Sequence, residues 1–336
     1  MADPPPRARN TAKSLEGGGG PIRALRPRMS LPRQIVAGAT YLLTRRVAQR
    51  QFLLRPSPLT AQIVLYALAY AASLTGVLVH AVVVMSNHIH LVVTDPEGRL
   101  PDFLRTLHRH IACCMNSALG RRENFWSSTG PNVVSLESDG DVLDKIAYVI
   151  TNPTAAGLVE TPAEWPGVVA PAEGMVIDAA RPPVYYNPKG KMPASIALQI
   201  APPSMSSYGS IDALLAALRE LIDERVRVAH EDIATSQRSF LGPTAVLATS
   251  IWDSATTPES RGERRPTFAA HNLDDRRRVR DRLRAFQGRY ADALHSWCRG
   301  DRSAAFPVGT WFMRVHHGAR IESDAADAVA PALPAA

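Results

Sequence analysis

The feature that most constrains the fold is a long uncharged stretch: between Arg55 and Asp95 the chain carries no Asp, Glu, Lys or Arg. A helix of that length could span a bilayer. Ser73-Leu74-Thr75-Gly76 divides the stretch, however, into a helix-length part and a Val-rich part, and valine suits a buried strand. The second part leads directly into two histidines, which a lipid-facing helix would not accommodate. We therefore predict a buried helix followed by a buried strand, without a membrane span.

The histidines stand in the run Met85-Ser86-Asn87-His88-Ile89-His90-Leu91. Successive side chains of a strand alternate between its faces, so His88 and His90 are expected on one face and Ile89 on the other. Two imidazoles on one face can share a metal ion. The ordinary alternative is a pair of histidines on a half-buried strand. His80 is also an even-numbered position and would lie on the same face, several residues before His88. We expect it to be a structural histidine.

A second segment, Tyr148-Val149-Ile150-Thr151-Asn152-Pro153, stands about sixty residues further on. We expect a helix that is capped by Asp139 or Asp141 and stopped by Pro153, because the residue before proline avoids helical angles. Tyr148 and Asn152 are four residues apart and would share a helix face. A core tyrosine followed by a helix stop is the ordinary interpretation.

Together the two segments resemble a known family. Met-Ser-Asn-His-Ile-His-Leu is similar to the signature of HUH single-strand DNA transposases. Tyr-Val-x-x-Asn-Pro, followed by Ala-Gly-Leu-Val, resembles a block of the REP-associated tyrosine transposases within that class. The resemblance covers roughly residues 30–170 and continues more weakly towards the C-terminus. Ser86 departs from the pattern, since proline is common there, as do Thr151 and Thr154-Ala155.

The resemblance implies an α/β (α+β) fold: an antiparallel sheet backed by helices, with an HUH, ferredoxin-like core, followed by a mainly α-helical C-terminal region. It implies cleavage and rejoining of single-stranded DNA at hairpin or palindromic repeats. Tyr148 would be the nucleophile that forms a 5′-phosphotyrosine. His88, His90 and Asn152 would hold Mg²⁺ or Mn²⁺, and two imidazoles favour Mn²⁺ or another transition metal.

Two other functions remain open. One is a DNA-binding regulator on the same fold without catalysis. The other is a metal-dependent nuclease that uses water in place of Tyr148. The predicted partner is single-stranded or hairpin DNA, and both a monomer and a homodimer are compatible with the sequence.

The charge balance suits a polyanionic partner, because the formal net charge is +7. The helix expected from about Pro101 to Leu119 has a basic polar face, and a basic pair precedes Val47. The candidate DNA contacts are Arg45, Arg46, Arg105, Arg109, Arg121 and Arg122. A solvated charged surface explains such residues equally well. Phe125-Trp126 could stack on unpaired bases or fill the edge of the core.

The chain divides into five parts on composition and periodicity. Residues 1–30 are expected to form a disordered basic tail and 31–168 the catalytic domain. Residues 169–208, rich in Pro, Ala and Gly, are expected to be a linker. Residues 209–320 are expected to form a mainly helical domain, which is a candidate DNA-binding region, and 321–336 a second disordered tail. Within the helical domain we predict helices at 211–230, 243–251 and 274–298 and a late strand at 311–315.

Three cysteines, Cys113, Cys114 and Cys298, do not form a disulfide framework. The adjacent pair is expected on a helix. This usage favours a reducing cytoplasm.

Overall fold

A computed structural model describes residues 32–171, 173–256 and 266–322. The described residues from Arg33 onward form one compact unit. The predicted tail at 1–30 lies outside the described residues, as does the predicted tail at 321–336 from residue 323 onward, while Ile321 belongs to a short strand.

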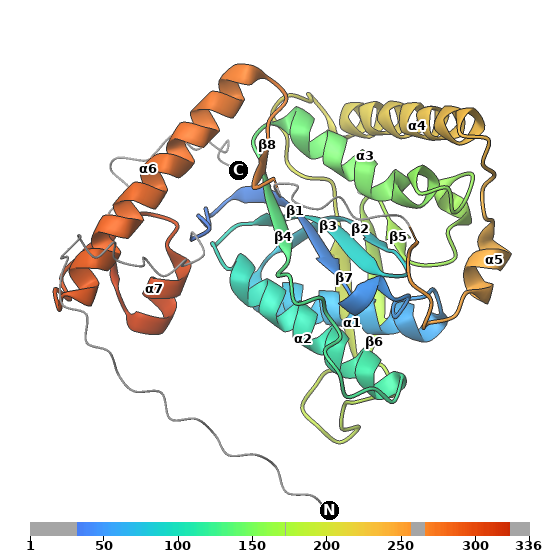
Figure 1. Ribbon diagram of the computed structural model, residues 1–336, viewed down its shortest axis with the longest axis horizontal. Coiled ribbons are helices and arrows are strands. Elements are labelled where there is room, and N and C mark those ends of the chain that lie inside the picture. The colour runs from blue at the N-terminus through green and yellow to red at the C-terminus, as the bar shows by residue number, and fades with distance from the viewer. Residues whose placement is uncertain (1–31, 172, 257–265, 323–336) are drawn as a thin grey trace, which may run out of the picture. The chain divides into compact units, whose positions relative to one another are not determined.

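The architecture is a mixed α/β sheet with helices on both faces (Figure 1). The strands are β1 (Ala39–Arg46), β2 (Leu78–Val84), β3 (His88–Asp95), β4 (Asn132–Leu136), β5 (Val169–Ala170), β6 (Met175–Ala180), β7 (Ser195–Ile200) and β8 (Phe268–Ala269). They run in the order β6-β7-β2-β3-β1-β4-β8, and β5 also pairs with β2. The central β2-β3-β1-β4 pairings are antiparallel, as the sequence predicted.

The main helices are α1 (Pro58–Thr75), α2 (Leu100–Ala118), α3 (Asp139–Ala155), α4 (Ile211–Thr235), α5 (Pro243–Ala248) and α6 (Leu273–Cys298). Short 3-10 turns occur at Ala48–Arg50 (η1) and Pro162–Glu164 (η2). The last elements are β9 (Ala305–Phe306), α7 (Trp311–His317) and β10 (Arg320–Ile321), and β9 pairs with β10 in a small sheet. The mainly helical C-terminal region was predicted.

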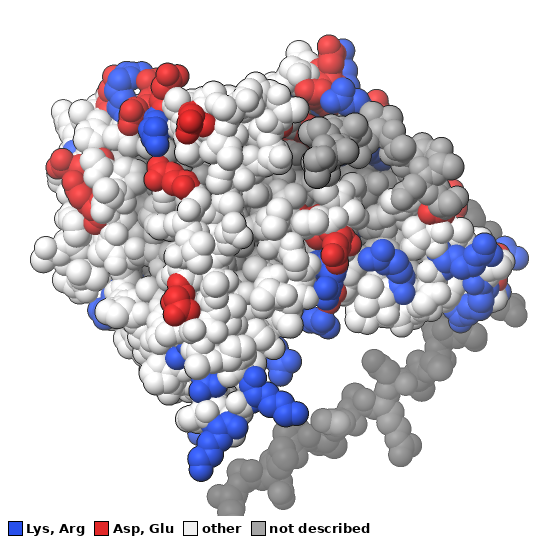
Figure 2. All heavy atoms as spheres, turned by 180° about the vertical axis from the view of Figure 1, so that it is seen from behind, with Lys and Arg blue, Asp and Glu red and all other residues white. Residues whose placement is uncertain are grey.

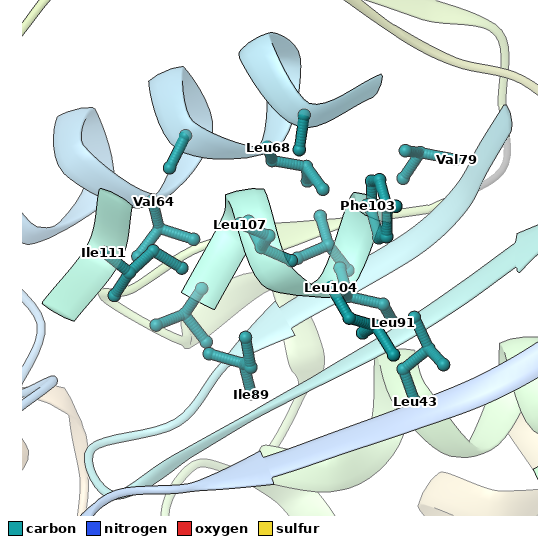
Figure 3. Close-up of a cluster of buried hydrophobic side chains, with 14 of the residues drawn as sticks. Leu43, Val64, Leu68, Val79, Ile89, Leu91, Phe103, Leu104, Leu107 and Ile111 are labelled. Carbon is teal, nitrogen blue, oxygen red and sulfur yellow. The ribbon is translucent and has the colours of Figure 1, made fainter. Parts of the chain in front are cut away.

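One face of the sheet is covered by α1 and α2. Alternate residues of β3, Ile89 and Leu91, pack there against Phe103 and Leu107 of α2 and Leu68 of α1 (Figure 3). All five side chains are at most 2% exposed, and full burial of such a side chain contributes about 1.5–3 kcal/mol. Within the described residues, α1 is the helix whose length and hydropathy would allow a membrane span. This helix packs on the sheet, as predicted for a buried helix.

The opposite face is covered by α3 and α4. Val92 of β3 packs there with Ile146, Val149 and Ile150 of α3. Leu214 of α4 joins the same cluster, so α4 forms the outer layer over α3. The alternation of β3 therefore directs its even-numbered residues towards α3.

Residues 169–208 are not the extended linker that composition suggested. They contribute β5, β6 and β7 to the main sheet. Ile196, Leu198 and Ile200 alternate along β7, and Leu198 and Ile200 are buried. This period of two was the signal for a strand, and the surrounding Pro and Gly residues concealed it.

Three smaller predictions were also wrong. Residues 311–315 belong to helix α7, which ends at Gly318 in the left-handed region, a common helix terminator. Ser138 caps α3 by accepting from the Asp141 amide, so neither predicted aspartate is the cap. Pro153 does not stop α3, because the Ala156 amide still bonds to the Asn152 carbonyl. Proline lacks an amide hydrogen and so removes one helix hydrogen bond. Helix α3 nevertheless continues for two residues beyond Pro153 and ends at Ala155.

Candidate active site

His88 and His90 lie at the start of β3, on the face that α3 covers. His88 pairs in register with Arg46 of β1, and His90 pairs with Thr44. The two imidazole rings are 4.6 Å apart between centroids. The prediction that both histidines share a face is confirmed.

Each imidazole is held through its Nδ1 atom. His90 Nδ1 shares a 2.8 Å hydrogen bond with the Thr44 hydroxyl. His88 Nδ1 lies 2.5 Å from Asn87 Oδ1. The Asn87 amide donates through Nδ2 to the Arg50 carbonyl, so its Oδ1 is the acceptor for His88. These contacts leave Nε2 of each ring as the atom that can accept a ligand.

Helix α3 brings Tyr148 and Asn152 to these histidines. The Tyr148 ring lies edge-on to the His90 ring, with 5.3 Å between centroids. The Asn152 side chain lies close enough to the His88 imidazole and the Tyr148 hydroxyl to influence the pKa of each. Asn152 lies within the helix rather than at its end, so its backbone is fixed. All four residues singled out in the two motifs meet in one cluster, the HHYN cluster (His88, His90, Tyr148, Asn152).

Burial controls protonation in the HHYN cluster. It lowers the pKa of His88 to about 4, helped by the charge of Arg46. It also lowers the pKa of His90 well below the ordinary value, with His88 and Arg46 adding to the effect. Both rings are therefore neutral at pH 7 and have a lone pair available. Burial raises the pKa of Tyr148, while hydrogen bonding from Asn152 and the charges of Arg225 and Arg46 act in the opposite direction.

Three cations surround Tyr148. Arg46 extends from β1 beside His88, and Arg225 extends from α4. Lys145, one turn before Tyr148, places its ammonium 5.9 Å from the Tyr148 ring centre. Asp144 pairs with both Lys145 and Arg225. Sequence reasoning missed Arg225 and Lys145, because their approach depends on the packing of α4 on α3.

The six predicted DNA contacts do not gather at one place. Of these, Arg46 is the one whose charge acts on both histidines. Arg105 and Arg109 lie on α2, which covers the opposite face of the sheet. Arg45 donates to the Thr129 carbonyl and lies over Trp126, and Arg121 lies over Trp252. Arg122 is exposed beside Arg121.

Several ordinary interpretations are confirmed elsewhere. His80 is buried and bonds to the Ala201 carbonyl and the Thr94 hydroxyl, away from His88. Phe125 is buried, and the Trp126 indole donates to the His108 carbonyl, so this pair fills the core edge. The three cysteines are free, and the adjacent pair lies on α2.

The donor set of the HHYN cluster suits a divalent transition metal. Across the described ranges, there is no group of three or more His, Cys, Asp or Glu side chains that could hold an ion. The cluster instead offers two imidazoles and a carboxamide, a nitrogen-rich set that fits Mn²⁺ better than Mg²⁺.

Comparison with known proteins gives structural similarity only. The sequence matches no protein-family model and no curated protein. One similar solved structure is a REP-associated tyrosine transposase bound to a REP hairpin, at 20% identity and a TM-score of 0.34. The match covers 40% of this chain and 79% of that one. Another is a candidate transposase from Deinococcus radiodurans, at 24% identity and a TM-score of 0.27, covering 37% and 97%. Because both TM-scores are low, the interpretation of the site depends on its own geometry.

Proposed function

We propose that this protein is a metal-dependent tyrosine transposase that cleaves and rejoins single-stranded DNA. Its substrate class is a hairpin or palindromic repeat, which the motif resemblance implies. The covalent intermediate is a 5′-phosphotyrosine on Tyr148.

The observation that carries the proposal is the contact of two separate motifs within one chain. His88 and His90 come from β3, and Tyr148 and Asn152 come from α3. A core tyrosine needs no pair of oriented imidazoles beside it. Here the rings of His90 and Tyr148 are in contact, and the Asn152 side chain lies near enough to His88 and Tyr148 to influence the pKa of both. A nucleophile next to ligands for a charge-neutralising ion is the arrangement that phosphoryl transfer requires.

Tyr148 supplies the nucleophilic oxygen. Its Oη gives up a proton and bonds to phosphorus, while the bond from phosphorus to the O3′ of the preceding nucleotide breaks. The leaving oxygen takes up a proton and becomes a free 3′-OH. Rejoining reverses these steps with the 3′-OH of another strand, so no nucleotide triphosphate is consumed. A phenol with an ordinary pKa near 10 is a weak nucleophile at neutral pH. The Asn152 amide and the charges of Arg225 and Arg46 act to lower the pKa of Tyr148 and so favour the phenolate.

His88, His90 and Asn152 would hold the divalent ion. Bound there, the ion would polarise the phosphate and neutralise charge that develops on it. Thr44 and Asn87 orient the two imidazoles through Nδ1, which keeps both Nε2 atoms available. Arg46 lies at the exposed side of the cluster and can accept the phosphate of an incoming strand.

The test is a cleavage assay on a labelled single-stranded hairpin with Mn²⁺ or Mg²⁺. The protein is expected to form a denaturant-resistant adduct that is lost in Tyr148→Phe and His88→Ala. Tyr185→Phe is the matched control, because Tyr185 is exposed and precedes a similar Tyr-Asn-Pro sequence. Cleavage that survives Tyr148→Phe without an adduct would identify a nuclease that uses water. Tight binding without cleavage in either metal would favour the regulator.

A further inference from the structure

A second polar feature lies beside the HHYN cluster, in a region that the motif resemblance covers weakly. It is a groove of about 820 Å³ between the start of α3, the segment around β8 and the first half of α6. Figure 1 shows β8 and the start of α6 beside the N-terminal end of α3. We call it the α3–α6 groove. Its lining residues are Asp141, Asp144, Lys145, Pro266, Thr267, Phe268, Ala269, Ala270, His271, Arg276, Arg280 and Arg284.

The position of α6 is fixed by specific contacts. Arg282 Nη2 donates to both carboxylate oxygens of Glu137, which follows β4, and each donor–acceptor distance is 2.9 Å. Val279 and Phe286 of α6 are fully buried. The β8 segment pairs in parallel with β4. The groove is therefore bounded by elements that are each attached to the sheet.

The carboxylates in the groove already have partners. Asp141 is buried and bonds to His271 and to Ser138. Asp144 pairs with Lys145 and Arg225, whose hydrogen bonds and charges outweigh the effect of burial and hold its pKa below the ordinary value. These contacts compensate the negative charge of the groove.

The arginines of α6 are less compensated. Arg276 bonds through Nε to the Ala270 carbonyl, which leaves its terminal nitrogens for other contacts. Arg284 forms a long, exposed pair of 3.6 Å with Asp281, and such pairs contribute little. Arg280 has no hydrogen bond or ion pair with any residue that the structure describes. The groove therefore presents positive charge along its α6 side.

The spacing of these arginines forms a regular row. Arg276, Arg280 and Arg284 follow each other at intervals of four residues, so they share one helix face. Each step advances roughly 6 Å along the axis. Long, flexible side chains at this interval can contact successive phosphates of an extended polynucleotide strand. A binding site for a single buried anion would not need three arginines spaced along the helix.

The groove and the proposed nucleophile are neighbours along α3. Asp141, Asp144 and Lys145 line the groove, and Tyr148 follows one turn after Lys145 on the same face. The Lys145 ammonium faces both the groove and the Tyr148 ring. On the face shown in Figure 2, by contrast, Lys and Arg lie in separate groups near the rim and much of the surface is uncharged.

We propose that the α3–α6 groove binds the sugar-phosphate backbone of a single nucleic-acid strand next to the HHYN cluster. Arg280 and Arg284 are the main phosphate contacts. The placement of the strand relative to Tyr148 rests on the proposed function, whereas strand binding in the groove does not.

The test measures the affinity of the full-length protein for a fluorescent oligothymidylate at several salt concentrations. Arg280→Ala/Arg284→Ala is compared with Arg277→Ala/Arg278→Ala, which removes the same charge from the same helix outside the groove lining. Loss of two phosphate contacts from a single strand lowers the slope of log K against log salt by about 1.4. The groove variant should bind on the order of tenfold more weakly at about 0.1 M salt. The control should stay within about twofold.

Equal losses in both double variants, or no loss in either, would overturn the proposal. Unchanged affinity in the groove variant would mean that the groove does not bind the strand. Its arginines would then suit another anion, such as an acidic protein segment. A second pair of variants avoids removing arginines. Thr267 is exposed and lines the groove, so Thr267→Glu should weaken binding while the neutral Thr267→Gln should not.

The two proposals fail separately. If wild-type protein forms no adduct but the groove variant still loses affinity, the catalytic proposal fails and the groove assignment stands. If the adduct forms on Tyr148 and the groove variant binds as the control does, the groove assignment fails alone.

Discussion

The ring of Tyr148 on α3 lies edge-on to the ring of His90 on β3, with 5.3 Å between their centroids. The two residues are far apart in sequence and meet because α3 packs on the face of the sheet to which His90 points. This contact joins the two sequence motifs in one site. Substitutions beside the site are therefore expected to change metal binding and the reactivity of Tyr148 more than matched substitutions elsewhere do.

Thr44→Val should weaken metal binding without unfolding the protein. The Thr44 hydroxyl is the Nδ1 partner of His90, and loss of such a supporting contact typically lowers metal affinity about 10–100-fold. Calorimetric titration with Mn²⁺ measures the effect. Thr40→Val is the control, because Thr40 lies on the same face of β1 and bonds to Thr94 at the other end of the strand. Equal effects of both substitutions would contradict this role of Thr44.

Asn152→Ala should reduce the rate of adduct formation about 10–100-fold and shift its Mn²⁺ dependence to higher concentration. The substitution removes both a candidate ligand and the side-chain amide that acts to lower the pKa of Tyr148. Asn152→Asp keeps an oxygen ligand but loses the amide donor. It should therefore retain metal affinity better than the alanine variant does. An unchanged Mn²⁺ dependence in Asn152→Ala would remove Asn152 from the ligand set.

Gly157→Ala should destabilise the protein more than Gly120→Ala. Both glycines have positive φ, where a non-glycine residue costs about 1–2 kcal/mol. At Gly120 an added Cβ meets open space, whereas at Gly157 it would lie 2.9 Å from Ile233 Cδ1 of α4. Urea unfolding compares the two variants. Equal losses of unfolding free energy would show that the contact between Gly157 and α4 is loose.

Acid should destabilise the protein partly through His108. Burial lowers the folded-state pKa of His108 to about 3, with the charge of Arg45 as a second cause. The unfolded chain takes up a proton below about 6.5, while the folded chain does not. Stability is therefore complete above that pH and is lost as pH falls towards 3. Between pH 7 and pH 5 the wild type should lose about 1–2 kcal/mol more than His108→Gln does. Parallel pH profiles in metal-free protein would contradict this.

Each half of the HHYN cluster could be predicted from the sequence, because the residues lie on strongly patterned elements. Strand alternation alone places His88 and His90 on one face, and helix periodicity places Tyr148 beside Asn152. Neither the strand alternation nor the helix periodicity predicts that the two pairs contact each other. That contact was implied by the family resemblance.

Contacts between elements that are far apart in the sequence could not be predicted from the sequence alone. Arg225 reaches Tyr148 because α4 lies over α3, and a solvated helix face looks the same in sequence. The α3–α6 groove likewise depends on the pairing of β8 with β4. The strands at residues 169–200 were missed because local Pro and Gly outweighed a short period-two pattern in β7.

The most direct test of the central claim is to locate the covalent adduct by mass spectrometry. Wild-type protein is incubated with a single-stranded hairpin and Mn²⁺, digested with nuclease and protease, and searched for a nucleotide mass on each tyrosine peptide. The account predicts a phosphonucleotide on Tyr148 that is absent from His88→Ala. Cleaved DNA with no modified tyrosine, or a modification on another tyrosine such as Tyr185, would contradict it.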